Sequence, residues 1–160
     1  FGCPFEGEVL PAKVIAIARE VADGDPIEIA IADTIGVGVP SQVTELLQRL
    51  NDALPGMPLR CHFHNTRNTG IANAYAAVEG GASVLDASIG GIGGCPFAPA
   101  ATGNIPTEDL LYMLHRMGIE TGVDLEATIA TGRWLQQQFG RPVPGMLVKA
   151  GSFPGAKERK

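Results

Sequence analysis

Residues 58–88 read PLRCHFHNTRNTGIANAYAAVEGGASVLDAS and hold two short apolar segments on either side of an amphipathic one. Pro58 to His64 and Ala82 to Ser88 are short and mostly apolar, as strands buried in a parallel sheet are. Between them, apolar side chains recur at helical spacing: Ile71, Ala74, Tyr75 and Val78. That spacing predicts a helix over about Thr69 to Glu79, which Gly80-Gly81 ends. The stretch therefore predicts a strand, a helix and a second strand.

The same alternation extends in both directions along the chain. Upstream, the pattern predicts a helix over Pro11 to Ala22, a strand over Ile27 to Ala32, and a helix from Pro40 to Pro55-Gly56. Downstream, helices are predicted over Pro106 to Met117 and Leu125 to Phe139. Strands that alternate with helices in this way favour right-handed crossovers and a parallel sheet, either closed as a barrel or open and doubly wound.

Composition limits the class of protein. The chain has 160 residues, of which 45% are hydrophobic and 18% charged, so it has enough apolar material for one globular core. A net charge of −5 without a basic run argues against a nucleic-acid partner, and no apolar stretch is long enough to span a bilayer. The three cysteines match no zinc or redox spacing, which favours a reducing compartment such as the cytoplasm.

His62 and His64 are two residues apart at the end of a predicted strand, so both side chains leave the same face. Such a pair can converge on one metal ion. The alternative is that they are core histidines with ordinary hydrogen-bond partners. Their place at a strand end, followed by the polar Asn65-Thr66, favours the metal.

Residues 89–104 read IGGIGGCPFAPAATGN, a glycine-rich loop before a helix. Glycine allows the backbone to approach a ligand closely. Cys95 lies among the glycines, where a thiol can take part in proton transfer, and Asn104 could offer an amide oxygen to a metal. The alternative is a merely flexible connection.

Two carboxylates remain open to either a structural or a functional interpretation. Asp33 follows a predicted strand and could act in catalysis or could shape the turn after that strand. Glu108 lies in the first turn of a predicted helix, where an acidic side chain suits the helix dipole.

Four segments together resemble the 3-hydroxy-3-methylglutaryl-CoA lyase family, within the superfamily of metal-dependent lyases and condensing enzymes. They are FGCPFEG at 1–7, ADTIGVG at 32–38, HFHNT at 62–66 and GGIGGCPFAPAATGNIPTEDL at 90–110. Related condensing enzymes carry Glu-Arg where this loop has Cys95-Pro96, so Cys95 favours a lyase. The resemblance implies an α/β fold that is the C-terminal part of a (β/α)₈ TIM barrel: about the last three to four βα units plus C-terminal helices. A complete barrel takes about 250 residues, so the chain is expected to be a fragment.

The resemblance also implies roles for particular residues. His62, His64 and Asn104 would hold a divalent cation, Mg²⁺ or Mn²⁺; Cys95 and Asp33 would be catalytic; Glu108 would be a supporting carboxylate. The reaction would cleave the C2–C3 bond of 3-hydroxy-3-methylglutaryl-CoA, and the full-length enzyme would be a homo-oligomer that acts on a small acyl-CoA. We expect residues 1–140 to form the partial barrel, and the Pro, Gly and Lys residues of 141–160 predict a flexible tail.

Two departures from the family pattern keep alternatives open. Better-known lyases have Asp at the position of Asn65, and nothing here matches the family's opening Asp-Arg-Glu strand, which supplies a further metal ligand. The alternatives are a lyase for another 3-hydroxy-acyl-CoA, a condensing enzyme similar to isopropylmalate synthase, and a non-catalytic module. The fragment alone is expected to be inactive.

Overall fold

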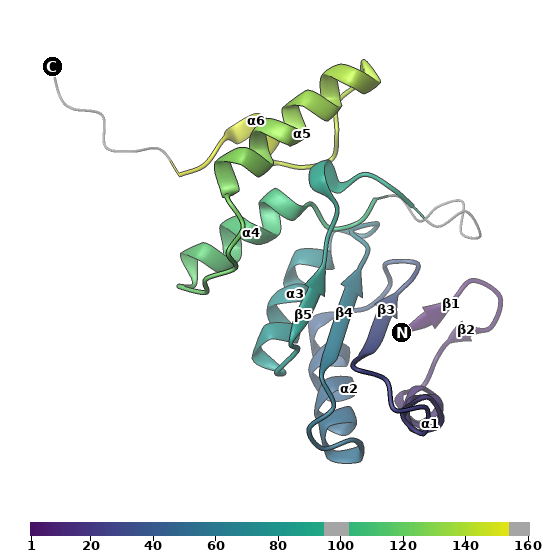
Figure 1. Cartoon of the computed structure of the whole chain (residues 1–160). Coiled ribbons are helices and arrows are strands. Elements are labelled where there is room, and N and C mark those ends of the chain that lie inside the picture. Colours follow the sequence, from purple (N-terminus) through teal and green to yellow (C-terminus); the bar gives the residue numbers. More distant parts are fainter. Residues whose placement is uncertain (95–102, 154–160) are drawn as a thin grey trace, which may run out of the picture. The chain divides into compact units, whose positions relative to one another are not determined.

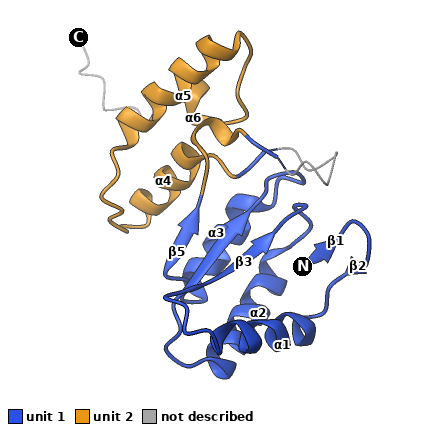
Figure 2. Cartoon of the chain, turned by 45° about the vertical axis from the view of Figure 1, so that its right-hand side comes forward, with its two compact units in different colours: residues 1–86, 93–104 blue, residues 87–92, 105–160 orange. Residues whose placement is uncertain are grey.

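The computed structural model of the chain describes residues 1–94 and 103–153. The chain divides into two compact units, which Figure 2 colours separately: the first comprises residues 1–86 and 93–104, the second residues 87–92 and 105–160. Each unit has its own buried apolar side chains, such as Leu47 and Phe63 in the first and Leu111 and Ile129 in the second.

The first unit is built on a three-stranded parallel sheet with the strand order β3-β4-β5 (Figure 1). Its elements in chain order are β1 (Gly2–Cys3), β2 (Gly7–Glu8), α1 (Pro11–Ala22), β3 (Ile29–Asp33), α2 (Pro40–Ala53), β4 (Leu59–Phe63), α3 (Gly70–Glu79) and β5 (Val84–Asp86). β1 and β2 form a separate antiparallel hairpin, which the sequence does not predict. Helices connect β3 to β4 and β4 to β5, so the predicted alternation of strand and helix is confirmed.

The helices of this unit form where proline can start them and apolar residues share one face. α1 and α2 both begin at a proline, whose missing N–H costs nothing at the first helical position. Within α2, the buried residues recur at helical spacing: Val43, Leu46, Leu47 and Leu50. Each fully buried leucine contributes about 1.5–3 kcal/mol relative to an exposed one. The helix is therefore held chiefly by packing.

The sheet has two different faces. Along β3 and β4, every second residue is buried, and these residues form what we call the covered face: Ile29, Ile31, Asp33, Leu59, Cys61 and Phe63. Helices α2 and α3 lie behind the strands in Figure 1. The residues between them form the open face: Ala30, Ala32, Arg60 and His62, joined by Asp86 of β5, which pairs with His62 in the register. Strand residues alternate between faces, so one strand serves both.

The second unit is helical. Its elements are the 3₁₀ turn η1 (Ile89–Gly91), α4 (Thr107–Arg116), α5 (Leu125–Phe139) and α6 (Leu147–Ala150). Asp124 directly precedes α5 and caps it, because its side chain accepts the Ala127 N–H at 3.0 Å. Asp109 of α4 accepts the N–H groups of Met146 and Leu147, both at 2.9 Å, and so caps the start of α6.

Residues 141–153 belong to the region predicted to be a flexible tail. Within them the structure has α6, and it buries Val143 and Val148. The sequence does not predict α6, because four residues are too few to show a helical period. The domain boundary at residue 140 stays a prediction. Among the described residues, no helix is both long and apolar enough to cross a membrane.

Candidate metal and catalytic site

The carboxyl end of β4 brings the predicted metal ligands of the first unit together. His62 lies on the open face, and His64 follows directly after the strand. The His64 backbone forms an isolated antiparallel bridge with Asn104, and the Asn65 N–H donates to the Gly103 carbonyl at 3.0 Å. A residue 40 positions along the chain is thus placed beside the histidines by main-chain pairing.

The two imidazole rings lie against each other. Their centroids are 5.0 Å apart and their planes are nearly perpendicular, at 81°. His64 is buried, and its Nδ1 lies 2.9 Å from the carbonyl oxygen of Asp33. Because a carbonyl oxygen can only accept, Nδ1 carries the proton and donates it, which leaves the Nε2 lone pair for a ligand.

His62 is half-buried and has a different partner. Its Nδ1 lies 3.9 Å from Asp86 Oδ2 on the neighbouring strand. Burial and then the neighbouring His64 lower the pKa of His62 below its ordinary value, while Asp86 acts in the opposite direction. The net direction favours a neutral ring, and a neutral imidazole is the form that binds metals.

Asn104 is held closely from the loop side. A Cβ added to Gly93 would lie 2.8 Å from Asn104 Nδ2, and Gly93 has a φ of 101°, where other residues are strained. The Gly103 N–H donates to the Gly93 carbonyl at 2.8 Å, which brings the two flanks of residues 94–102 together. Gly93 and Gly103 therefore hold the backbone close to the Asn104 side-chain amide.

The residues present fit a divalent cation. Two imidazoles and one amide meet at one strand end, and the tautomer of His64 leaves its metal-binding nitrogen without a proton. No group of three His, Cys, Asp or Glu side chains within residues 1–94 and 103–153 is arranged to hold a metal. The predicted set has only two residues of those types, so its remaining ligands would be oxygen atoms from substrate, water or other residues.

Asp33 is fully buried, and backbone groups occupy both of its carboxylate oxygens. The Val37 N–H donates to Oδ1 at 3.0 Å and the Gly38 N–H to Oδ2 at 2.9 Å. Asn73 of α3 donates in turn to the Gly38 carbonyl at 2.9 Å. These bonds are what the turn-shaping interpretation of Asp33 predicts, and its catalytic assignment stays a prediction.

Glu108 lies in the second unit and is also fully buried. Its two carboxylate oxygens accept the Gly90 N–H, at 3.1 and 3.0 Å. Burial raises its pKa above the ordinary value, and the hydrogen bond from Gly90 offsets part of that rise. A Cβ on Gly145 would collide with Oε1, so glycine is required beside this carboxylate. Glu108 supports the η1 turn, and any role in the reaction stays a prediction.

Cys95, the predicted catalytic thiol, lies outside the described residues. The other two cysteines are free thiols: Cys3 is half-buried and Cys61 is buried in the covered face.

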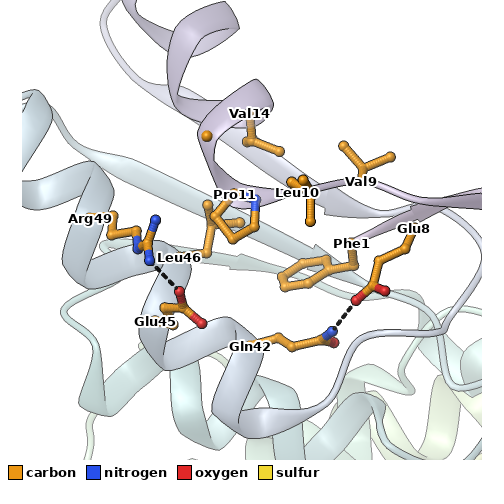
Figure 3. A pocket seen from close by; sticks show the side chains of 11 residues that line it. Phe1, Glu8, Val9, Leu10, Pro11, Val14, Gln42, Glu45, Leu46 and Arg49 are labelled. Atoms are coloured by element: carbon orange, nitrogen blue, oxygen red, sulfur yellow. Dashed lines mark hydrogen bonds and ion pairs between the residues drawn. The ribbon is translucent and has the colours of Figure 1, made fainter.

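A pocket of about 400 Å³ lies elsewhere in the first unit, between α1 and α2 (Figure 3). Its apolar lining includes Phe1, Val14 and Leu46, and none of the predicted site residues lines it. Its polar side chains pair with one another: Gln42 donates to Glu8 at 3.4 Å, and Arg49 pairs with Glu45 at 2.7 Å.

The open face also carries two ion pairs that share Arg60, and the sequence did not predict them. Arg60 lies two residues before His62 on β4 and pairs with Asp86 and with Glu28, each at 2.6 Å. The spacing of Arg60 and His62 is visible in the sequence. Their pairing with Asp86 depends on the register between β4 and β5, which one sequence does not reveal.

The chain is similar to several lyases. The (R)-citramalyl-CoA lyase of Chloroflexus aurantiacus is 50% identical over 151 residues, covering 94% of this chain and 48% of that protein. A hydroxymethylglutaryl-CoA lyase of Pseudomonas mevalonii is 45% identical over 139 residues, covering 87% of this chain and 46% of that protein. The chain therefore spans about half the length of the curated relatives it matches.

Solved structures agree with the sequence relatives. An HMG-CoA lyase from Acinetobacter baumannii, solved in complex with coenzyme A and 3-methylmalate, matches with a TM-score of 0.92 and 41% identity, covering 100% of this chain and 52% of that one. The predicted fold class, part of a TIM barrel, is confirmed, as is the predicted resemblance to lyases of this type. Residues 1–135 match the HMGL-like family, and the chain belongs to it.

Proposed function

We propose that this chain is part of an acyl-CoA lyase that cleaves 3-hydroxy-3-methylglutaryl-CoA between C2 and C3, giving acetyl-CoA and acetoacetate. The observation that carries the proposal is the meeting of His62, His64 and Asn104 at the end of β4. The names of relatives at 40–50% identity support the same class of reaction. The reaction belongs to the whole protein, of which this chain would supply these three residues and the loop that carries Cys95.

A divalent cation, Mg²⁺ or Mn²⁺, would be held by His62, His64 and Asn104, and when bound it supplies Lewis-acid polarisation and a template for the substrate's oxygen atoms. The chain's part is to present the two rings in one orientation. His64 is fixed by its bond to the Asp33 carbonyl, and His62 packs against it.

The protons and electrons of the cleavage balance within the site. The C3 hydroxyl loses its proton to a base, the C2–C3 bond breaks, and its electron pair moves onto the thioester as an enolate. Cys95 then donates its thiol proton to C2, which gives acetyl-CoA, and the proton that the base took from the hydroxyl returns to the Cys95 thiolate, directly or through water. A cysteine of ordinary pKa is mostly protonated at neutral pH, so it can act as this acid.

We propose that Asp33 is the carboxylate that assists removal of the proton from the C3 hydroxyl. Its side chain is fully buried and accepts two backbone N–H groups, which favours an indirect effect on the reaction. Asp33 would act by fixing the turn after β3 and by orienting His64, whose Nδ1 donates to the Asp33 carbonyl. A direct transfer would need the substrate to reach one of the remaining lone pairs.

A second candidate substrate is (R)-citramalyl-CoA, because the relative with that activity in its name is 50% identical to this chain. Both substrates are 3-hydroxy-acyl thioesters with a methyl group on C3 and a terminal carboxylate, and they differ by one methylene. The same proton transfers would release acetyl-CoA from either. A single methylene is worth only about 1–3 kcal/mol in a pocket, so the choice between them is a matter of fit.

Product analysis with the whole protein tests the reaction. The protein would be supplied with Mn²⁺ and incubated with 3-hydroxy-3-methylglutaryl-CoA and with citramalyl-CoA in separate reactions. Acetyl-CoA together with acetoacetate from the first supports the proposal, and release of pyruvate from the second alone supports the second candidate. Acetyl-CoA from neither would remove the lyase assignment.

Cys95→Ser tests the acid. A positioned general acid contributes roughly 10²–10⁴-fold, so kcat should fall by about that factor while Mn²⁺ binding stays normal. Cys3→Ser is the matched control, because it changes a half-buried thiol of β1 and should leave kcat unchanged. Normal turnover by Cys95→Ser would overturn the assignment.

A further inference from the structure

We propose that Asp86 is a positioning residue that orients the His62 imidazole for cation binding, and that Arg60 holds Asp86 in place. This inference rests on the proposed function, since it concerns the use of His62 as a metal ligand. It goes further by giving each histidine its own orienting group. His64 has a backbone carbonyl, and His62 has a side-chain carboxylate.

The parallel register places Asp86 beside His62. β4 pairs with β5 so that His62 lies opposite Asp86 and Arg60 opposite Val84. Paired residues of neighbouring strands point to the same face, so His62, Arg60 and Asp86 all lie on the open face. The three charged or titratable groups are neighbours because of the sheet, with no loop involved.

Asp86 divides its two oxygens between Arg60 and His62. Oδ1 accepts from Arg60 Nη1 at 2.6 Å, and Oδ2 lies 3.9 Å from His62 Nδ1. On its other side, Arg60 is bound by Glu28, which accepts from Nε at 2.7 Å and lies 2.6 Å from Nη2. A guanidinium fixed from both sides leaves the Asp86 carboxylate little freedom to turn away from the ring.

The carboxylate favours the tautomer of His62 that a cation needs. A distance of 3.9 Å is longer than a hydrogen bond, so the contact is electrostatic. A negative charge on the Nδ1 side stabilises a proton on Nδ1 and leaves the Nε2 lone pair for metal binding. His62 shares a strand end with His64, and both rings would then present Nε2.

The competing interpretation is that Glu28, Arg60 and Asp86 form an ordinary structural ion pair. These side chains are 25–36% exposed, and partly exposed pairs of this kind contribute only about 0–1 kcal/mol to stability. The chain offers a matched control, because Glu28 and Asp86 both pair with Arg60 but only Asp86 is paired across the register with His62. A structural role would make the two carboxylates equivalent.

Mn²⁺ titration of the whole protein, followed by electron paramagnetic resonance, separates the two interpretations. Loss of an outer partner of a metal-binding histidine costs about 10–100-fold in affinity, so Asp86→Asn should raise the Kd for Mn²⁺ by that factor. Glu28→Gln should change it less than about twofold. Asp86→Glu, which keeps the charge, should recover part of the loss, and thermal unfolding of each variant verifies that it is folded.

A second measurement needs no metal. Nitrogen-15 chemical shifts of the histidine rings report which nitrogen carries the proton. Asp86→Asn should lower the share of His62 protonated on Nδ1 and leave His64 unchanged, because the partner of His64 is the Asp33 carbonyl. An unchanged His62 tautomer would overturn the inference.

The outcomes also separate this inference from the proposed function. If His62→Ala binds Mn²⁺ as tightly as the wild type, the proposed metal site fails, and this inference fails with it. If His62→Ala weakens binding while Asp86→Asn does not, only the role of Asp86 is overturned. Equal losses in Asp86→Asn and Glu28→Gln would likewise overturn it and assign the effect to Arg60.

Discussion

The covered and open faces of the β3-β4-β5 sheet come from the same strands, yet they carry opposite kinds of side chain. The covered face is buried and, apart from Asp33 at the end of β3, apolar, with Leu59, Cys61 and Phe63 contributed by β4. The open face carries Arg60 and His62 from that strand. Alternation along five residues thus separates the side chains that stabilise the fold from those proposed to bind the cation, so substitutions on the two faces should have separable effects.

The largest effect on stability is expected from Phe63→Ala. Phe63 is 1% exposed, and the centroid of its ring lies 6.5 Å from that of the Phe1 ring. Removing a fully buried phenylalanine side chain costs about 3–5 kcal/mol in the free energy of unfolding. Urea denaturation measures it. His62→Ala, one residue earlier on the open face, serves as the comparison and should cost less than about 1 kcal/mol. Equal costs would contradict the separation of the two faces.

A smaller effect is expected at high pH from Cys61. Burial raises the pKa of its thiol from 9.0 to about 12. The folded state therefore keeps the proton longer than the unfolded state. The resulting stabilisation is fully present below pH 9 and is lost as the pH rises toward 12, by about 1.4 kcal/mol per unit.

The Cys61→Ala variant isolates this pH dependence from other groups that titrate in the same range. Between pH 8 and 10.5, the free energy of unfolding of the wild type should fall by about 2 kcal/mol more than that of the variant. Parallel pH profiles for the two proteins would mean that the thiol is less protected than the covered face implies.

The smallest effect on stability is expected from Arg60→Met on the open face. The ion pairs of Arg60 are partly exposed, so its loss should change the free energy of unfolding by less than about 1 kcal/mol. Affinity for Mn²⁺ should nevertheless fall, since Asp86 loses the group that holds it. A large loss of stability would show that the open face also carries part of the fold.

The regular elements could be predicted from the sequence wherever proline or glycine marks an end and the apolar period is long enough. The predicted helices over Pro11 to Ala22 and Leu125 to Phe139 agree with α1 and α5. The strands are shorter than predicted: β5 covers only Val84–Asp86. The β1-β2 hairpin and α6 were missed, since elements of two to four residues have no readable period.

The candidate site could be predicted in part. Spacing on a strand is enough to place His62 and His64 together, and the structure brings Asn104 beside them. Asp86 was missed because its contact depends on strand register. The partner of His64 was missed because it is the main-chain oxygen of Asp33. Every residue has such an oxygen, so the residue types in a sequence do not indicate which one a histidine binds.

The bond from His64 to that main-chain oxygen has an evolutionary consequence. Every amino acid carries a carbonyl, so the orientation of this ring can survive a change of residue at position 33 as long as the path of the backbone is kept. The ring of His62 has no such protection if it relies on a carboxylate that one mutation can remove. In a randomised library, therefore, position 86 should tolerate fewer residue types than its partial exposure suggests.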